Sequence, residues 1–302
     1  MKILSYYPIH RTFLNSIASL FPETEFDLAR TPQIVLSECE KIWDKNLIPF
    51  ENNIHILDEG WNKVDDSKYD LRITWYPTEQ FLSRNWSIPS VYVVLNRGDP
   101  VLLENKSVII YNTQQPTPKK HIYLTVGSSH VGRWTGEDNR TYFVDQKSWK
   151  VRWSNKTIIG NWASMLIETL QEVRMRVPFY FPLEQVPWEM WMAKRRELRA
   201  YIEISIRAMS STFFESLLMG QPTVVPNWPE FNSVIKHGEN GLLYRTKEEC
   251  THMAGLLIND YDLAKKLGAA GRETAEAIAG DDIRKRQWTE AFNLALEKKG
   301  KR

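Results

Sequence analysis

Short runs rich in β-branched and aromatic residues recur along this chain and alternate with segments of helical periodicity. This alternation is typical of βα units, in which a mostly parallel sheet is covered by helices on both faces. The clearest helical patterns in the first half occupy residues 12–21 and 78–85. The first half is therefore predicted to form one doubly wound α/β layer. Its predicted strands are KILSYY at residues 2–7, DLRITW at 70–75, SVYVVL at 90–95, SVIIYN at 107–112 and HIYLTV at 121–126.

A polar, glycine-bearing segment at residues 127–150 interrupts this rhythm before the alternation resumes. Domain boundaries usually fall in such segments, so we predict two Rossmann-like domains, one over residues 1–145 and one over residues 146–302. After Asp260 the pattern is helical to near the end, which adds terminal helices to the second domain. The other elements predicted there are helices at 162–173, 189–198 and 213–220 and strands at 178–182, 200–205, 222–226 and 241–244.

The composition is that of a globular protein, with 42% hydrophobic and 25% charged residues among 302 positions. No apolar stretch approaches the roughly 20 residues needed to cross a bilayer, and the N-terminal segment lacks the long apolar centre of a secretory signal. The two cysteines, Cys39 and Cys250, lie far apart and offer neither a disulfide framework nor paired metal ligands. We therefore expect a cytoplasmic protein without a transmembrane segment. The net charge of +2 provides no global field for strong non-specific attachment to nucleic acid.

Residues 210–228, SSTFFESLLMGQPTVVPNW, combine a polar cluster, one acid, an apolar run and a Gly-x-Pro step. Thr212 and Glu215 have the spacing of a capping box, and Gly220 is placed to end the helix that follows. The N-terminus of this helix is expected at the carboxyl edge of a parallel sheet, where helix amides and the dipole favour phosphates. Amides and hydroxyls there would bind a diphosphate, and the acid would accept hydrogen bonds from sugar hydroxyls. The predicted donor-binding residues in this segment are Ser210, Ser211, Thr212 and Glu215.

The longer segment SSTFFESLLMGQPTVVPNWPEFNSVIKHGENGLLY resembles the donor-binding signature of GT-B glycosyltransferases of the retaining family 4, also called glycosyl transferases group 1. The resemblance rests on a glutamate, a Gly-x-Pro step, a valine strand and H-G-x-N-G in order, and it covers about residues 185–275. In that family the glutamate at the position of Glu215 holds the ribose of the nucleotide sugar. The resemblance implies two Rossmann-like doubly wound domains facing across a cleft, with the acceptor in the first domain and the donor in the second. It also implies no metal and no cofactor, since the nucleotide sugar is a substrate.

The sequence departs from the family pattern eight residues before Glu215, where Arg207 replaces a glutamate that contacts the transferred sugar. Either Glu203 substitutes through a local shift, or the sugar is held differently. The basic clamp that the family places on the donor diphosphate is predicted at Arg152 and Lys156, after the first strand of the second domain. Arg207, if it turns inward, is a further candidate to stabilise the departing diphosphate.

Two histidines are candidates for binding the acceptor or the transferred sugar. His10 follows the first predicted strand, and His130 lies in the loop after HIYLTV, so both are expected at the carboxyl edge of the first sheet. A solvated loop histidine is the alternative for each, because loops carry many polar residues without a function. The candidate catalytic residues are therefore His130, His10 and Arg207.

Some of these motifs also have a purely structural interpretation. Asp260 and Asp262 form a literal D-x-D, which binds a divalent ion in the other major glycosyltransferase fold. They open a predicted helix, however, where an N-cap and a first-turn acid are expected, so no metal site is predicted. Gly220 and Asn240 likewise suit an ordinary helix stop and a tight turn.

Taken together, the residues and the resemblance predict a metal-independent glycosyltransferase that moves a hexose from a nucleotide-diphosphate sugar, of the UDP-glucose type, to a hydroxyl. Retention of configuration is implied by the resemblance alone. The acceptor is left open between a modified DNA base, as in DNA glucosyltransferases of bacterial viruses, and a small glycan. A non-catalytic nucleotide-sugar or glycan-binding module is the alternative, and Arg207 in place of the expected acid supports it. The sequence does not predict an oligomeric state.

Overall fold

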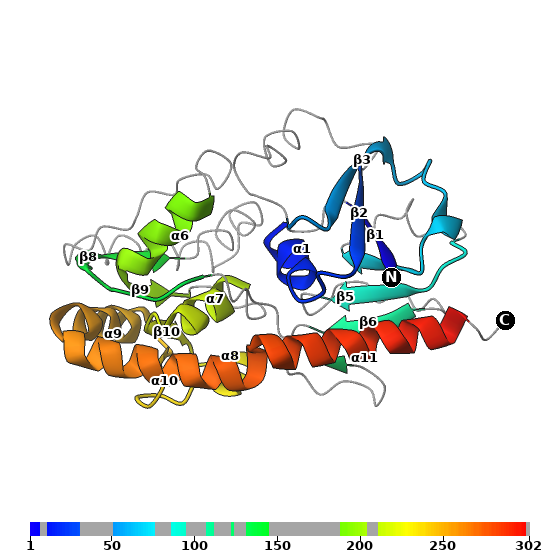
Figure 1. Ribbon diagram of the computed structural model, residues 1–302. Helices are drawn as coiled ribbons and strands as arrows, with labels where there is room; N and C mark the ends of the chain where they lie inside the picture. The colour runs from blue at the N-terminus through cyan, green and yellow to red at the C-terminus, as the bar shows by residue number, and fades with distance from the viewer. Residues whose placement is uncertain are drawn as a thin grey trace, which may run out of the picture. The chain divides into compact units, whose positions relative to one another are not determined.

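The computed structural model describes residues 1–6, 11–30, 51–75, 86–94, 107–111, 122–123, 131–144, 188–203 and 211–299. The chain divides into two compact units (Figure 1). The first contains residues 1–126 together with 281–302, and the second contains residues 127–280.

The described part of the first unit forms a seven-stranded sheet in which every pairing is parallel. Its strand order is β3-β2-β1-β4-β5-β6-β7. The chain therefore runs outward from the central strand first in one direction and then in the other, as in a doubly wound sheet. The strands are β1 (Lys2–Tyr6), β2 (Glu25–Arg30), β3 (Ile54–Gly60), β4 (Leu71–Trp75), β5 (Ser90–Val94), β6 (Ser107–Tyr111) and β7 (Ile122–Tyr123). The helices are α1 (Arg11–Ala18), the short 3₁₀ turn η1 (Asp66–Lys68) and α11 (Asp281–Lys299).

Apolar side chains of the described strands pack in buried clusters on both faces of this first sheet. On one face Ile3 and Phe26 pack with α1 and α11 in one buried cluster, and on the other Leu4 packs with Trp61 and Trp86. This two-residue period is the pattern expected of a strand buried on both sides. Each cluster removes aromatic and aliphatic area from water, which is the main stabilising term for the unit.

The second strand carries a buried carboxylate, Asp27. Asp27 is 3% exposed and lies within hydrogen-bond distance of the Tyr69 hydroxyl at 2.7 Å and of the Lys2 ammonium at 3.0 Å. These partners compensate the loss of hydration that burial imposes on the charge. β2 and β3 were not among the predicted strands, because the acids in EFDLAR and IHILDEG interrupt their apolar pattern.

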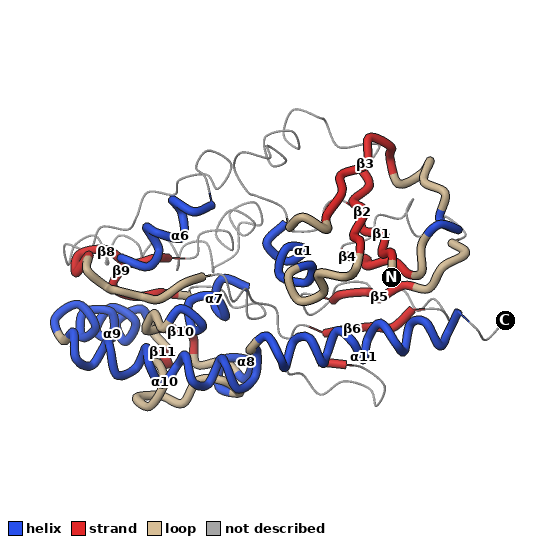
Figure 2. The backbone as a smooth tube through the Cα atoms, viewed as in Figure 1, coloured by secondary structure: helices blue, strands red, loops and turns tan. Residues whose placement is uncertain are grey.

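The last helix belongs to the first unit, whereas residues 146–302 were expected to form one domain. Trp288, Ala291, Phe292 and Ala295 lie on one face of α11 and are buried in the cluster that contains Ile3. Their i, i+3, i+4, i+7 spacing makes a continuous apolar stripe. The spacing predicts a buried face but carries no information about which sheet covers it. Figure 2 shows α10 and α11 as separate consecutive helices.

The described part of the second unit forms a four-stranded sheet, again entirely parallel, in the order β11-β10-β9-β8. β8 lies in the segment where we expected the domain junction, and it pairs with β9. The boundary expected at residue 145 therefore falls after a strand that belongs to the second sheet. The strands are β8 (Asp138–Val144), β9 (Leu198–Ile202), β10 (Thr223–Pro226) and β11 (Leu242–Tyr244). The helices are α6 (Trp188–Glu197), α7 (Ser211–Met219), α8 (Pro229–Asn232), α9 (Lys247–Asn259) and α10 (Tyr261–Ala279).

Alternating residues of this sheet also face two separate buried clusters. Tyr201 and Val225 pack with the phenylalanines of α7, while Ile202 and Val224 pack with residues of α9 and α10. The predicted alternation of strands and helices is confirmed where the structure describes it. No helix in the described ranges is long and apolar enough to span a membrane.

Candidate functional site

The βαβ unit β9-α7-β10 positions the segment singled out in the sequence. β9 and β10 are parallel neighbours, so α7, which connects them, must start at the carboxyl edge of the sheet. Ser211 and Thr212 are the first two residues of α7, and the first four backbone amides of a helix have no partner within the helix. In open α/β sheets ligands bind outside this edge.

Glu215 occupies a different helical position from the one predicted. α7 begins at Ser211, so Glu215 is its fifth residue. A capping box with Thr212 would require Thr212 to precede the first helical residue. The boundary of α7 therefore differs from this prediction, and the carboxylate projects from the second turn rather than from the cap.

Glu215 and Arg195 form a buried ion pair. The Arg195 side chain comes from α6, is 1% exposed and donates from Nη1 to Glu215 Oε2 at 2.7 Å. Its second terminal nitrogen, Nη2, donates to the hydroxyl of Ser216 at 2.8 Å. The guanidinium thus spans two consecutive residues of α7 and fixes the Glu215 carboxylate by a charge-assisted hydrogen bond.

This pair is energetically sensitive because Glu215 is itself only 4% exposed. Removing one partner of a buried pair leaves an uncompensated charge and typically costs about 3–5 kcal/mol. Gln221 contacts the backbone at the C-terminal end of α6. Its Nε2 donates to the carbonyls of Arg195 and Leu198 at 3.3 and 3.1 Å. The position of Arg195 is therefore fixed at both its backbone and its side chain.

Sequence reasoning missed Arg195. It lies in the run AKRRELR, which predicts an exposed basic face of a helix. In the structure Arg195 and Arg199 are both buried, and the guanidinium of Arg199 lies 4.6 Å from the ring centroid of Tyr261. Two basic residues of this run therefore do not contribute to an exposed basic face.

Glu203 was the alternative candidate for contacting the transferred sugar. It follows β9 directly, yet it is 0% exposed, and its Oε2 accepts a hydrogen bond from the Tyr201 hydroxyl at 2.5 Å. The Tyr244 hydroxyl donates to the Glu203 backbone carbonyl at 2.8 Å. These contacts make Glu203 an interior residue that ties β9 to β11 and does not present its carboxylate at the surface.

Gly220 ends α7 as predicted, with a positive φ of 85°. The Gly220 amide donates to the Leu217 carbonyl and the Gln221 amide to the Ser216 carbonyl, both at 2.9 Å, which satisfies the last carbonyls of the helix. α10 passes close to this turn, and a Cβ added at Gly268 would lie 2.1 Å from the Gly220 carbonyl oxygen. The close approach of the two backbones therefore requires glycine at position 268.

The HGENG segment forms a folded loop held by its asparagine. Asn240 is 6% exposed; its Oδ1 accepts from the Lys236 amide at 2.7 Å, and its Nδ2 donates to the Val234 carbonyl at 3.0 Å and the Thr274 hydroxyl at 2.9 Å. His237 is exposed and accepts a hydrogen bond from the Leu243 amide at its Nδ1, at 3.0 Å. The loop is thus joined to α10, and this part of the motif has a structural role.

Two further polar side chains stand at the carboxyl ends of β10 and β11. The Asn227 amide is best oriented with its oxygen toward Arg245, whose Nε then donates to it at 2.8 Å. Trp228 follows Asn227 and is 42% exposed. The aromatic contact between Phe213 and Phe231, 5.2 Å between centroids, packs α8 beside the first turns of α7. These residues therefore belong to the same edge of the sheet as the start of α7.

Most of the predicted site residues lie outside the described ranges, and their placement stays a prediction. These are His10, His130, Arg152, Lys156, Arg207 and Ser210. Of the predicted donor-binding residues, the described part of the chain contains Ser211, Thr212 and Glu215.

The aspartates of the literal D-x-D have the structural role that their context predicted. Asp260 is the N-cap of α10, and its Oδ1 accepts from the Leu263 amide at 2.8 Å, while Asp262 lies in the first turn. Within the described ranges, no group of three or more His, Cys, Asp or Glu side chains is arranged to hold a metal ion.

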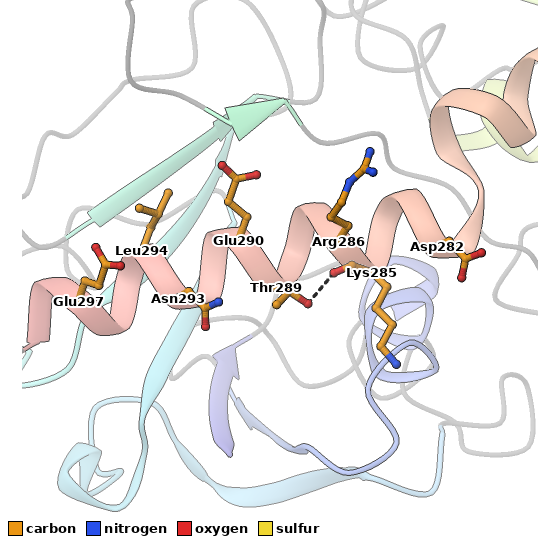
Figure 3. A pocket seen from close by; sticks show the side chains of 8 residues that line it. All are labelled: Asp282, Lys285, Arg286, Thr289, Glu290, Asn293, Leu294 and Glu297. Carbon is orange, nitrogen blue, oxygen red and sulfur yellow. Dashed lines mark hydrogen bonds between the residues drawn. The ribbon is translucent and has the colours of Figure 1, made fainter.

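The described residues of α11, in the first unit, line a hollow (Figure 3). Its side chains carry both charges and are exposed, and the Thr289 hydroxyl donates back to the Lys285 carbonyl of its own helix at 2.8 Å. A hollow lined by both acidic and basic side chains does not favour binding of a diphosphate in the way that a helix N-terminus does. The lining residues are Asp282, Lys285, Arg286, Thr289, Glu290, Asn293, Leu294 and Glu297.

Solved structures of similar architecture cover nearly the whole chain. A glycosyltransferase from Rickettsia africae superposes with a TM-score of 0.63 at 12% identity, over 98% of this chain and 98% of that chain. Anabaena HepE in complex with UDP and glucose gives 0.60 at 12% identity, over 97% and 99%. Sucrose-phosphate synthase from Thermosynechococcus elongatus gives 0.60 at 11% identity, over 97% and 98%.

The chain has the GT-B fold. Its two units with parallel sheets, each covered by helices, are the two Rossmann-like layers of that fold. The predicted fold class is thereby confirmed, and identities of 11–12% establish the fold alone. No family model matches the sequence.

Proposed function

We propose that this protein is a glycosyltransferase that moves a hexose from a nucleotide-diphosphate sugar, of the UDP-glucose type, to a hydroxyl acceptor. In the transfer, the bond between the anomeric carbon and the diphosphate oxygen breaks, and a bond to the acceptor oxygen forms. The acceptor hydroxyl loses its proton, and the nucleoside diphosphate leaves. The proposal includes retention of configuration, independence of metal ions and a cytoplasmic location, which are expectations from the sequence.

The observation that carries this proposal is the agreement between the motif and the fold. The ordered motif from Glu215 to Asn240 occupies the β9-α7-β10 unit and the following loop of a GT-B fold. The start of α7 lies at the edge where such folds bind ligands. Among the superposable structures, HepE was solved with UDP and with UDP-glucose.

The roles proposed for the donor site follow the charge of the ligand. The amides of Ser211 and Thr212 at the start of α7 would bind the diphosphate, together with Ser210 and the basic clamp of Arg152 and Lys156. Glu215 would accept hydrogen bonds from the ribose hydroxyls. Stabilisation of the departing diphosphate and positioning of the acceptor would supply most of the rate enhancement. The residues proposed to act around the transferred sugar are His10, His130 and Arg207.

The acceptor is proposed to be a modified DNA base or a small glycan, and salt dependence separates the two. Duplex binding through phosphate contacts weakens steeply as salt rises, whereas binding of a neutral glycan does not. A fluorescent duplex titrated at low and high salt would therefore favour one of them. Saturation that is unchanged by salt, or no binding at all, would contradict the DNA acceptor.

A second candidate function is a nucleotide-sugar or glycan-binding module without turnover. Arg207 stands where the related signature has a sugar-contacting glutamate, and Glu203, the nearest alternative acid, is fully buried. This module would bind UDP-glucose but release no UDP from it.

The test is to incubate the protein with a panel of nucleotide sugars and candidate acceptors and to measure the nucleoside diphosphate released. Glu215→Gln is the informative variant, because glutamine keeps the volume and an acceptor oxygen for Arg195, whereas alanine would remove the carboxylate partner of the buried guanidinium. Glu239→Gln makes the same chemical change at an exposed position of the same motif and serves as the control. We expect loss of turnover in Glu215→Gln alone. Absence of both binding and release in the wild-type protein would refute the proposed function.

A further inference from the structure

We propose that Arg195 is a positioning residue for the donor site, which holds the Glu215 carboxylate in the orientation needed to bind the nucleoside ribose. This inference rests on the proposed function. Arg195 lies in α6, away from the motif in sequence, and nothing in the pattern of the motif includes it.

The two oxygens of the Glu215 carboxylate are in different environments. Oε2 accepts the hydrogen bond from Arg195 Nη1 at 2.7 Å. Within the part of the chain that the structure describes, this is the hydrogen bond that the Glu215 side chain makes, so Oε1 retains its capacity to accept. A carboxylate held through one oxygen can offer the other to a ribose hydroxyl without further loss of side-chain freedom.

The guanidinium is held rigidly, which makes it suitable as a positioning group. Nη2 donates to the Ser216 hydroxyl at 2.8 Å, so the planar fork is fixed at two points on α7. The Gln221 side chain holds the backbone of Arg195 at its carbonyl. A lysine at this position keeps the charge but cannot bond Glu215 and Ser216 simultaneously with the same fork geometry.

The competing explanation is that the pair only attaches α6 to α7. The first unit provides a matched control for that role. Arg284 is also 1% exposed, and it also bonds a carboxylate, Asp281, and a serine hydroxyl, Ser16. Substituting either arginine by lysine alters a buried guanidinium that bonds a carboxylate and a serine hydroxyl; Asp281 is exposed whereas Glu215 is buried, and only Arg195 contacts the proposed donor-binding carboxylate.

The experiment measures the dissociation constants of UDP and 2′,3′-dideoxy-UDP by calorimetry for the wild type, Arg195→Lys, Ser216→Ala and Arg284→Lys. The analogue lacks both ribose hydroxyls, so the ratio of the two constants reports the ribose contact. We expect the wild type to prefer UDP by at least about tenfold, since a hydrogen bond to a charged group contributes on that order.

Arg195→Lys should raise the dissociation constant of UDP by about tenfold and change that of the dideoxy analogue by less than about twofold. The ratio of the two constants should therefore fall toward one. Ser216→Ala should reduce the preference less, because the bond to Glu215 remains. Arg284→Lys should lower the melting temperature and leave both constants unchanged. A double variant, Arg195→Met with Glu215→Gln, removes both charges and should bind UDP no more weakly than Glu215→Gln alone.

Three results would overturn the inference. A folded Arg195→Lys that keeps the wild-type preference shows that the pair is only structural. If Arg195→Lys does not fold, the double variant provides the test. If it binds UDP more weakly than Glu215→Gln does, Arg195 does not act through Glu215. A wild type that binds UDP but does not distinguish the dideoxy analogue shows that Glu215 does not hold the ribose. In this experiment the proposed function is contradicted by a different result, a wild type that binds no nucleoside diphosphate, which separates the two conclusions.

Discussion

Close packing between α10 and the turn that ends α7 gives a sharp prediction for Gly268→Ala. The added methyl group would lie 2.1 Å from the Gly220 carbonyl oxygen and 3.3 Å from the Pro222 nitrogen. Both are backbone atoms, so relief requires the helix or the turn to move. Gly220 has a positive φ of 85° and caps α7, which limits the movement available to the turn.

The expected magnitude follows from two opposing terms. Alanine in place of glycine favours a helix by about 0.5–1 kcal/mol. Overpacking in a well-packed region typically costs about 1–3 kcal/mol, and the contact here is with backbone, so the unfavourable term should dominate. Gly255→Ala in α9 is the matched control, because nothing lies within 4 Å of the added Cβ. That variant should be stabilised by the helical term alone.

The assay is differential scanning calorimetry with far-ultraviolet circular dichroism to confirm the fold. Subtracting the helical gain from the overpacking cost leaves a net loss of up to about 2.5 kcal/mol for Gly268→Ala. For a unit of about 150–250 residues, 1 kcal/mol shifts the melting temperature by about 2–4 °C, so Gly268→Ala should melt up to about 10 °C lower and Gly255→Ala about 1–4 °C higher. If Gly268→Ala melts at or above the wild-type temperature, the close approach of α10 to the Gly220 turn is not a packing constraint.

Three other predictions concern buried polar groups. Asn240→Ala should lower stability by about 2–4 kcal/mol in urea unfolding, because the Lys236 amide and Val234 carbonyl lose buried partners, and an unchanged midpoint would contradict the loop's structural role. Burial and the hydrogen bond to Asp27 raise the pKa of Tyr69 above 10.0, so the folded protein retains a proton that the unfolded chain releases; stability should therefore fall above pH 10, by at most about 1.4 kcal/mol per pH unit. Tyr69→Phe should remove this slope, and an equally steep decline in the variant would show another cause. Burial raises the pKa of the Cys250 thiol, so Ellman's reagent should label that residue only after denaturation, as peptide mapping would show.

The sequence predicted many of the elements of the second unit because its signals are local. Three of these signals depend only on residues close together in the chain. They are the β-branched run TVVP, the positive φ that glycine permits at position 220, and the N-cap aspartate Asp260. The ordered motif also made Glu215 the predicted ribose-binding carboxylate, because its spacing to Gly220 and Asn240 is fixed by one βαβ unit and its loop.

Tertiary structure decided the features that depend on contacts between distant residues. The apolar stripe of α11 predicts burial but not the sheet that buries it, and Trp288 packs in the first unit because the cluster around Ile3 covers it there. β8 was missed because a strand is defined by its partner, and its partner β9 lies more than fifty residues away. Arg195 reads as one charge in an exposed basic run. Its burial against Glu215 follows from the packing of α6 on α7, since a buried guanidinium needs polar partners and Glu215 and Ser216 of α7 supply them.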